Sequence, residues 1–260
     1  MKIALAQMLV EGGRPRENLE RARDFIRRAK EAGAEVVVLP ECLDSGWLHP
    51  SGRDSPPIPG AHSDALAAAA RDIGIMVVAG IAERSGTSVH NSAVLIDRSG
   101  RLLRTHRKIN ELDFARELYT TGTSLAAVDT DLGRIGVAIC ADLAPGADSI
   151  GHAMGHMRPL AILSPAAWAV PPGHDDLTDR YGGMWLQSYS GIAKRFSIPV
   201  IGVSNVGDVT TGPWAGWRCI GCSLAIGPDG SELWRGPYGS RAEALHVVDV
   251  ATPASPALTT

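Results

Sequence analysis

The sequence predicts an α/β fold built on mixed β-sheet. Short apolar segments that suit buried strands alternate with longer segments of helical periodicity, which is typical of α/β proteins. Two pairs of strand-like segments follow each other closely, as in hairpins, and favour a mixed sheet over a purely parallel one. The 260 residues are 45% hydrophobic with a formal charge of -3. They fit a single domain over residues 1–250 and a loosely held C-terminal tail over residues 251–260.

The first half of the chain begins with a strand and an amphipathic helix. Residues 2–8 are an apolar run typical of a buried strand. Residues 16–32 place apolar side chains at helical spacing as far as Gly33, a natural helix stop. The β-branched run at residues 36–39 predicts a second strand. A helix over residues 65–71 follows, and then strands over residues 76–82, 91–96 and 101–106.

The second half continues this alternation. Residues 135–139 are five apolar or glycine residues between a charge and a turn, which suits a strand buried on both faces with Cys140 at its carboxyl end. The chain must turn there because Pro145 and Gly146 follow almost at once. The remaining predicted elements are helices over residues 149–157 and 181–196 and strands over residues 160–163, 199–204, 220–226 and 245–250.

The composition argues against several classes of protein. Charges of both signs are mixed along the chain, whereas a nucleic-acid-binding domain carries a basic face. No stretch is apolar over the length of a membrane span, and no signal-peptide pattern precedes the first strand. Four cysteines are too few for a disulfide framework and suit a reducing compartment. We therefore expect a soluble, cytoplasmic protein with no nucleic-acid and no membrane partner.

Three predicted strands end in residues that can carry chemistry. Glu41 and Lys108 closely follow the strands at residues 36–39 and 101–106, and Cys140 ends the strand that begins at residue 135. In open α/β sheets, ligands bind beyond the carboxyl ends of the strands. A free cysteine is more often a buried structural residue, and a glutamate is more often a solvated surface charge. Position alone leaves those alternatives open.

Together, the three residue types suit cleavage of an amide or nitrile C–N bond through a thioester. A thiol with a pKa of about 8.5 is mostly protonated at neutral pH and needs a base, which a desolvated carboxylate such as Glu41 provides. His106 is the alternative base. The developing oxyanion needs a cation or N–H donors, which Lys108 and the backbone of Ala141 can supply. Because alternate residues of an extended segment share a face, we predict that only Lys108 of the surrounding basic run turns inward.

These residues lie in motifs through which the sequence resembles the nitrilase, or carbon-nitrogen hydrolase, superfamily over nearly the whole chain. Each motif alone is weak, but three catalytic motifs in the right order are a strong signal. The motifs are Leu-Pro-Glu at residues 39–41 with Gly-Trp at 46–47, His-Arg-Lys-Ile-Asn-Glu-Leu at 106–112, Gly-Val-Ala-Ile-Cys-Ala-Asp at 136–142, Leu-Ser-Pro-Ala-Ala-Trp at 163–168 and Pro-Val-Ile-Gly-Val-Ser-Asn-Val-Gly at 199–207.

The resemblance implies a four-layer α-β-β-α sandwich of two mixed sheets, with the site at the carboxyl ends of the inner strands. It implies Glu41, Lys108 and Cys140 as catalytic residues, and a homodimer or larger homo-oligomer. It also implies a second glutamate that positions the lysine. Glu117 matches the usual place of this residue ahead of a glycine, and Glu111, three residues after the lysine, is the alternative. We predict Glu117.

The implied reaction is hydrolysis of a non-peptide C–N bond in a small molecule, without a cofactor. A carboxamide or N-carbamoyl substrate is favoured because amidase-type branches are the more numerous in this superfamily. A nitrilase and a catalytically silent binding subunit are the alternatives. Two segments that border the expected pocket depart from the family pattern, at residues 109–112 and 144–147. The substrate therefore stays open.

Several tryptophans have predicted places. Trp47 and Trp168 closely follow predicted strand ends and, together with Ala141, are predicted to contact the substrate. Trp185, within a predicted helix, is expected in the core. The loop at residues 211–217, with its two tryptophans, either covers the mouth of the pocket or contacts a partner subunit.

No metal site is predicted. Cys219 and Cys222 form a C-x-x-C pair, but no second pair completes a zinc site. His152 and His156 lie four residues apart on a predicted helix but lack the glutamate of an H-E-x-x-H arrangement. We expect these two histidines at the surface or at the rim of the pocket.

Overall fold

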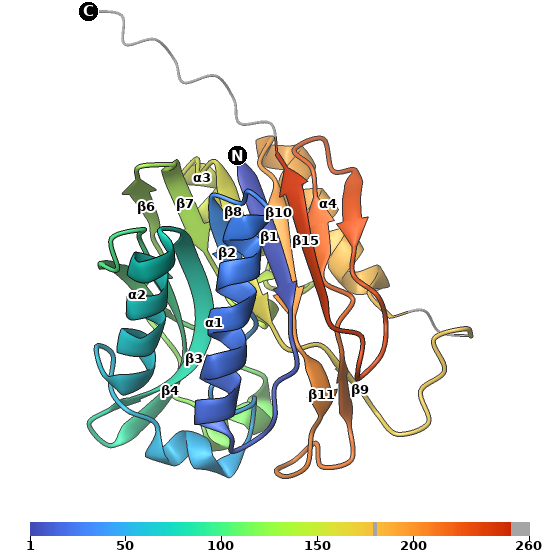
Figure 1. The fold of residues 1–260 in the computed structure, drawn as a ribbon. Helices are drawn as coiled ribbons and strands as arrows, with labels where there is room; N and C mark the ends of the chain where they lie inside the picture. Colours follow the sequence, from blue (N-terminus) through green and yellow to red (C-terminus); the bar gives the residue numbers. More distant parts are fainter. Residues whose placement is uncertain (179–180, 251–260) are drawn as a thin grey trace, which may run out of the picture.

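The computed structural model describes residues 1–178 and 181–250 and arranges them as a four-layer α-β-β-α sandwich (Figure 1). Two six-stranded mixed sheets pack face to face, and helices cover the outer face of each. The predicted fold class is confirmed. The C-terminal tail predicted for residues 251–260 lies outside the described residues.

The first sheet has the strand order β15-β1-β2-β3-β4-β5. Its strands β1, β2 and β3 run parallel, while β15, β4 and β5 pair antiparallel with their neighbours. The strands are β1 (Lys2–Gln7), β2 (Val36–Val38), β3 (Met76–Ser85), β4 (Ser88–Ile96), β5 (Leu102–Arg107) and β15 (Ala244–Asp249), and the covering helices are α1 (Pro15–Glu31) and α2 (Ala61–Ile73).

Side chains of the first sheet alternate between two cores. In β1, Ile3 and Leu5 face the core between the sheets, whereas Ala4 and Ala6 pack in the core beneath α1 and α2. Because both faces of the strand are covered, successive residues that face either core are apolar, and no alternation of polar and apolar residues appears. This explains why these strands appear in the sequence as uninterrupted apolar runs.

The second sheet has the strand order β14-β13-β10-β8-β7-β6, and β7, β8 and β10 run parallel at its centre. Trp185, Tyr189 and Ile192 on α4 are buried in the same core as the inner strands. The strands are β6 (Ala127–Thr130), β7 (Gly133–Val137), β8 (Ala161–Ala166), β10 (Val200–Ser204), β13 (Leu224–Ile226) and β14 (Glu232–Arg235), and the helices are α3 (Asp148–His156) and α4 (Gly183–Phe196). Within the described ranges, no helix is long and apolar enough to cross a membrane.

The strand predicted over residues 220–226 is not continuous, and its first residue belongs to a third, small sheet. Gly221 and Cys222 both take left-handed backbone conformations, with φ of 68° and 58°. Two such residues in succession cannot continue a strand, so the chain breaks there into β12 and β13. The small sheet has the order β11-β12-β9, with β9 (Ala169–Val170), β11 (Val206–Asp208) and β12 (Arg218–Ile220), and the short 3₁₀ helices are η1 (Pro50–Asp54), η2 (Asp113–Glu117) and η3 (Cys140–Leu143).

The topology brings the predicted catalytic residues to one end of the sandwich. Since β5 is antiparallel to β4 and β4 is antiparallel to β3, β5 runs in the direction of β2 and β3. The segments after β2 and β5 therefore leave the first sheet at the same end of its strands. The backbone N–H of Glu41 donates to the carbonyl of Ala166 at 3.2 Å and so joins this end of the first sheet to the carboxyl end of β8 in the second sheet.

Candidate active site

The segments that follow β2, β5 and β7 bring Glu41, Lys108 and Cys140 together. Lys108 Nζ donates to Glu41 Oε1 at 2.7 Å, and each of these side chains is only 1% exposed. Cys140 is 8% exposed and lies close enough to both for their charges to change its pKa. The three residues predicted to be catalytic thus form one buried cluster.

Glu41 has one occupied and one unoccupied carboxylate oxygen. Its Oε1 accepts from Lys108 and, at 2.6 Å, from Asn91 Nδ2 on β4. Its Oε2 is buried and makes no hydrogen bond with the described residues. The approach of β3 to this turn requires Gly80, because a Cβ there would lie 2.5 Å from Glu41 Cα. The carboxylate is held firmly while one oxygen stays available to take a proton.

Lys108 is buried as a cation. Burial lowers the pKa of its ammonium, but the carboxylates of Glu41 and Glu111 outweigh this effect and hold the pKa well above its usual value. A positive charge at this position can oppose a negative charge that develops on a substrate.

The second glutamate beside the lysine is Glu111, not the predicted Glu117. Glu111 Oε2 lies 3.7 Å from Lys108 Nζ and its side chain is 0% exposed. Glu117 ends the short helix η2 with its side chain exposed to solvent. Because the chain turns immediately after Lys108, a residue only three positions later can fold back onto it. Burial raises the pKa of Glu111 to about 7.

Cys140 opens a tight turn. The residue has a left-handed φ of 42°, which is uncommon for a side chain other than glycine, and its N–H donates to Ser164 Oγ on β8 at 3.1 Å. Burial raises the pKa of the thiol, and the charge of Glu41 raises it further, while Lys108 and the backbone N–H of Ala167 act in the opposite direction. The thiol is therefore protonated at rest and needs a base, and Glu41 is the carboxylate beside it.

His106 corrects the prediction that only Lys108 turns inward from the basic run. Its side chain is 2% exposed, on the same face of the segment as Lys108, and its Nε2 lies 2.8 Å from Asp142 Oδ2. Arg107 points the other way and pairs with Glu83. Because the Nε2 of His106 is engaged with Asp142, the structure gives no support to a Cys–His pair.

One tryptophan, Trp47, lies against this cluster. The Trp47 ring centroid lies 5.7 Å from Lys108 Nζ, and Trp214 packs edge-on against Trp47 at 4.7 Å. The loop at residues 211–217 therefore packs against Trp47. Trp168 is buried in the core that contains Cys140 and stacks on Trp185 at 5.1 Å, which confirms Trp185 as a core residue. Contact of Trp47, Trp168 or Ala141 with a substrate stays a prediction.

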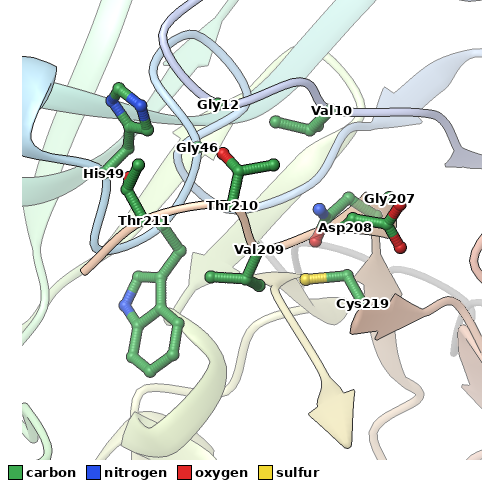
Figure 2. A pocket seen from close by; sticks show the side chains of 12 residues that line it. Val10, Gly12, Gly46, His49, Gly207, Asp208, Val209, Thr210, Thr211 and Cys219 are labelled. Carbon is green, nitrogen blue, oxygen red and sulfur yellow. The ribbon is translucent and has the colours of Figure 1, made fainter. Parts of the chain in front are cut away.

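A narrow hollow opens beside Trp47, bordered by the segments that carry His49, Asp208 and Thr211 (Figure 2). Its volume is about 20 Å³, roughly the space of one water molecule. Asn205 Oδ1 and Trp47 Nε1, on two of the lining residues, are buried without a hydrogen-bond partner among the described residues. The hollow suits a water or one small polar group.

Several residues at the site were not singled out from the sequence. Asn91 lies within β4, where no pattern separates it from an ordinary buried amide, whereas Asn205 follows β10 within the motif at residues 199–207. Asp142 stands two residues after Cys140 in the motif that was noted, so its position was a usable signal. In the part of the chain that the structure describes, no group of three or more His, Cys, Asp and Glu side chains is placed to hold a metal ion.

Comparison with known families matches residues 2–252 to the carbon-nitrogen hydrolase family. The match covers nearly the whole chain and includes all three members of the buried cluster. The chain therefore belongs to the carbon-nitrogen hydrolase family.

Among characterised relatives, omega-amidase NIT2 of Danio rerio is 34% identical over 138 residues, which are 49% of this chain and 50% of that protein. A nitrilase of Pyrococcus abyssi is 32% identical over 178 residues, which are 62% of this chain and 67% of that protein. The chain thus aligns with about half the length of the omega-amidase.

Solved structures share the fold. A carbon-nitrogen hydrolase of Helicobacter pylori G27 superposes with a TM-score of 0.85 at 19% identity, over 96% of this chain and 89% of that one. Nit3 of Saccharomyces cerevisiae, a member of the nitrilase superfamily, superposes with a TM-score of 0.80 at 23% identity, over 95% and 89% of the two chains.

Proposed function

We propose that this protein hydrolyses a non-peptide C–N bond of a small carboxamide or N-carbamoyl compound through a thioester on Cys140, and that it releases ammonia or an amine. The observation that carries the proposal is the buried cluster itself. A cysteine, a carboxylate with one unengaged oxygen and a cationic lysine meet at one end of the sandwich. Such a set of residues supplies the nucleophile, the base and the oxyanion stabiliser of an acyl transfer.

In the acylation half, Glu41 accepts the thiol proton of Cys140, and the sulfur attacks the carbonyl carbon. The electron pair of the C=O bond moves to oxygen, where Lys108 and the backbone N–H of Ala141 stabilise the oxyanion. When the carbonyl reforms, the C–N bond breaks and Glu41 returns its proton to the leaving nitrogen. The products are a thioester on Cys140 and free ammonia or amine.

In the deacylation half, Glu41 takes a proton from water, and the resulting hydroxide adds to the thioester carbon. Lys108 again faces the oxyanion. The C–S bond then breaks, the acid leaves, and the proton held by Glu41 returns to the sulfur. Glu41 thus acts once as base and once as acid in each half, a role that suits a carboxylate with one oxygen already fixed by Lys108 and Asn91.

The relatives support this chemistry. An omega-amidase and a nitrilase are among the proteins that the chain resembles in sequence. The E41Q mutant of an amidase from Nesterenkonia sp. AN1, which has this fold at 22% identity, has been observed after Michael addition of acrylamide at its active-site cysteine.

A substrate panel tests the proposal. Ammonia release is measured with carboxamides, N-carbamoyl amino acids and nitriles, and the Cys140→Ala variant serves as the blank. We expect turnover of at least one carboxamide or N-carbamoyl compound by the natural protein and none by the blank. Turnover of nitriles alone supports the second candidate, a nitrilase, which the resemblance to the Pyrococcus protein favours. Equal ammonia release by protein and blank would refute both.

We infer in addition that the protein acts as a homodimer or a larger homo-oligomer. The inference rests on the membership of the carbon-nitrogen hydrolase family. Light scattering coupled to size-exclusion chromatography measures the mass directly. A mass of 27.4 kDa, that of one chain, at assay concentration would exclude the inference.

A further inference from the structure

A second buried pair of polar side chains, His106 and Asp142, lies beside the catalytic cluster. The side chains are 2% and 0% exposed, and His106 Nε2 lies 2.8 Å from Asp142 Oδ2. His106 stands two residues before Lys108, and Asp142 stands two residues after Cys140. The pair therefore joins the segment that carries the lysine to the segment that carries the cysteine.

The Asp142 carboxylate makes three further hydrogen bonds, all with backbone N–H groups. Oδ1 accepts from Ile109 at 2.9 Å and from Asn110 at 2.8 Å, and Oδ2 accepts from Ile139 at 3.0 Å. With His106, four donors fill the roughly four lone-pair positions of an ionised carboxylate. Two of these donors are neighbours of the catalytic residues, because Ile109 directly follows Lys108 and Ile139 directly precedes Cys140.

The two segments joined by Asp142 belong to different sheets. Lys108 follows β5, the edge strand of the first sheet, and Cys140 follows β7 of the second sheet. A β-bridge between Leu9 and Val206 links the two sheets beyond β1 and β10. Among the described residues, however, no strand pairing links the segments after β5 and β7, so the separation of these two segments depends on contacts such as these. Asn110 Nδ2 adds a parallel link by donating to the carbonyl of Ala141 at 2.7 Å.

We propose that Asp142 is a positioning residue that fixes the separation of Lys108 and Cys140, so that the ammonium faces the oxyanion formed on the cysteine. This inference rests on the proposed function. His106 acts through Asp142, as the donor that completes its set of partners. Displacement of a catalytic group by about 1 Å can cost about 100-fold in rate, and loss of the Asp142 carboxylate is expected to have an effect of that order.

The test is the variant Asp142→Asn, with Asp97→Asn as its matched control. Asparagine keeps the size of the side chain, but its NH₂ group cannot accept and would face N–H donors. Asp97 is likewise an aspartate that accepts two backbone hydrogen bonds, from the N–H groups of Ser99 and Arg101 at 2.9 Å each, but it lies in the turn between β4 and β5, at the opposite end of β5 from Lys108. Each variant is assayed for kcat, KM and thermal unfolding.

We expect Asp142→Asn to lower kcat about 100-fold with KM changed less than about threefold, whereas Asp97→Asn changes kcat less than about threefold. If Asp142 acts through Lys108, the two effects are not additive. On a Lys108→Ala background, Asp142→Asn should then cost less than about threefold further. The proposal would be overturned if Asp142→Asn lowered kcat equally in the natural protein and in the Lys108→Ala variant. It would also be overturned if Asp142→Asn lowered the melting temperature but left kcat normal per intact Cys140.

Two readouts keep the test decisive. If Asp142→Asn does not fold, His106→Gln, which keeps a side-chain N–H donor, is compared with His106→Leu. Higher kcat in the glutamine variant supports the proposal, and equal kcat contradicts it.

If the natural protein hydrolyses nothing on the panel, the proposed function fails separately. The rate of Cys140 alkylation by iodoacetamide then reports positioning, and it should fall at least threefold in Asp142→Asn but not in Asp97→Asn because a displaced Lys108 lowers the thiol pKa less. Equal rates in the two variants would refute the role of Asp142.

Discussion

The turns that carry Glu41 and Cys140 are built from similar parts but anchored differently. Each follows a parallel strand and contains a residue with left-handed φ, Cys42 at 45° in one and Cys140 at 42° in the other. Each also contains a buried aspartate paired with a histidine. Asp44 bonds to elements of its own sheet and covering helix, whereas Asp142 bonds across to the other sheet.

This difference separates two sources of active-site geometry. The Glu41 turn is held mainly by the first sheet and its covering helices, with one backbone hydrogen bond from Glu41 to Ala166 of the second sheet. The Cys140 turn takes part of its geometry from the segment after β5. The distance between Cys140 and Lys108 therefore depends on how the two sheets pack. Side-chain contacts between the segments after β5 and β7 must define that distance.

Replacement of the nucleophile should give the largest effect. Cys140→Ser keeps the shape of the turn but replaces a thiol with a much less acidic alcohol, so kcat is expected to fall by about 10⁴-fold or more with the fold retained. Circular dichroism checks the fold. Mass spectrometry should find iodoacetamide on Cys140 before Cys42, Cys219 or Cys222. Labelling of a different cysteine in step with loss of activity would move the nucleophile to another turn.

The Glu41→Gln variant tests whether Glu41, in the turn that is held mainly by the first sheet, acts as the base. Glutamine can still accept from Lys108 and Asn91, but it cannot act as a base, so we expect kcat to fall by about 10²- to 10⁴-fold. The His106→Ala variant is the comparison, since His106 was the alternative base. Near-normal kcat in Glu41→Gln together with an inactive His106→Ala would point to a cysteine–histidine mechanism and contradict the assignment.

Lys108 lies where the two anchored turns meet. Lys108→Ala should lower kcat/KM by about 10²- to 10³-fold, as expected for loss of one oxyanion stabiliser. Lys108→Arg should be nearly as damaging, because the planar guanidinium is bulkier and spreads its charge. Arg107→Ala is the control, since Arg107 faces away and pairs with Glu83. Substantial activity in Lys108→Arg, or a severe defect in Arg107→Ala, would show that the segment is oriented differently.

Replacement of Glu111 should give the smallest effect. It should change the folding stability and the way in which this stability depends on pH. Its pKa is about 7 in the folded protein, whereas an ordinary glutamate has a pKa of about 4.5, so between these values the folded state holds a proton that the unfolded state has released. Folding stability from this group therefore falls as the pH rises from about 4.5 to about 7. Urea denaturation at pH 5 and pH 7.5 should show Glu111→Gln gaining stability relative to the natural protein at the higher pH. A difference that does not change with pH would argue against the raised pKa.

The sequence predicted most strands of the two large sheets and the meeting of Glu41, Lys108 and Cys140, because buried strands leave apolar runs whose ends are clear. It missed the short or less apolar strands β6, β9, β11 and β14. It did not predict the partner of Lys108. The choice between Glu111 and Glu117 depends on how the chain folds after β5, where the short helix η2 turns Glu117 outward. Local spacing carries no such information.

Two other differences have similar causes. The inward position of His106 follows from the same alternation that places Lys108, and was missed because a basic run suggested a solvated face. The break between β12 and β13 requires left-handed conformations at Gly221 and Cys222. Glycine permits such a conformation, but cysteine gives no sign of it in a sequence.

Hydroxylamine trapping tests the central claim, the thioester on Cys140, most directly. Hydroxylamine competes with water for an acyl-enzyme, so with an active amide substrate the natural protein should form the hydroxamate at the expense of the free acid. The Cys140→Ala variant should form neither product. Free acid released by the natural protein with no hydroxamate at saturating hydroxylamine, or hydroxamate formed equally by Cys140→Ala, would contradict the covalent mechanism.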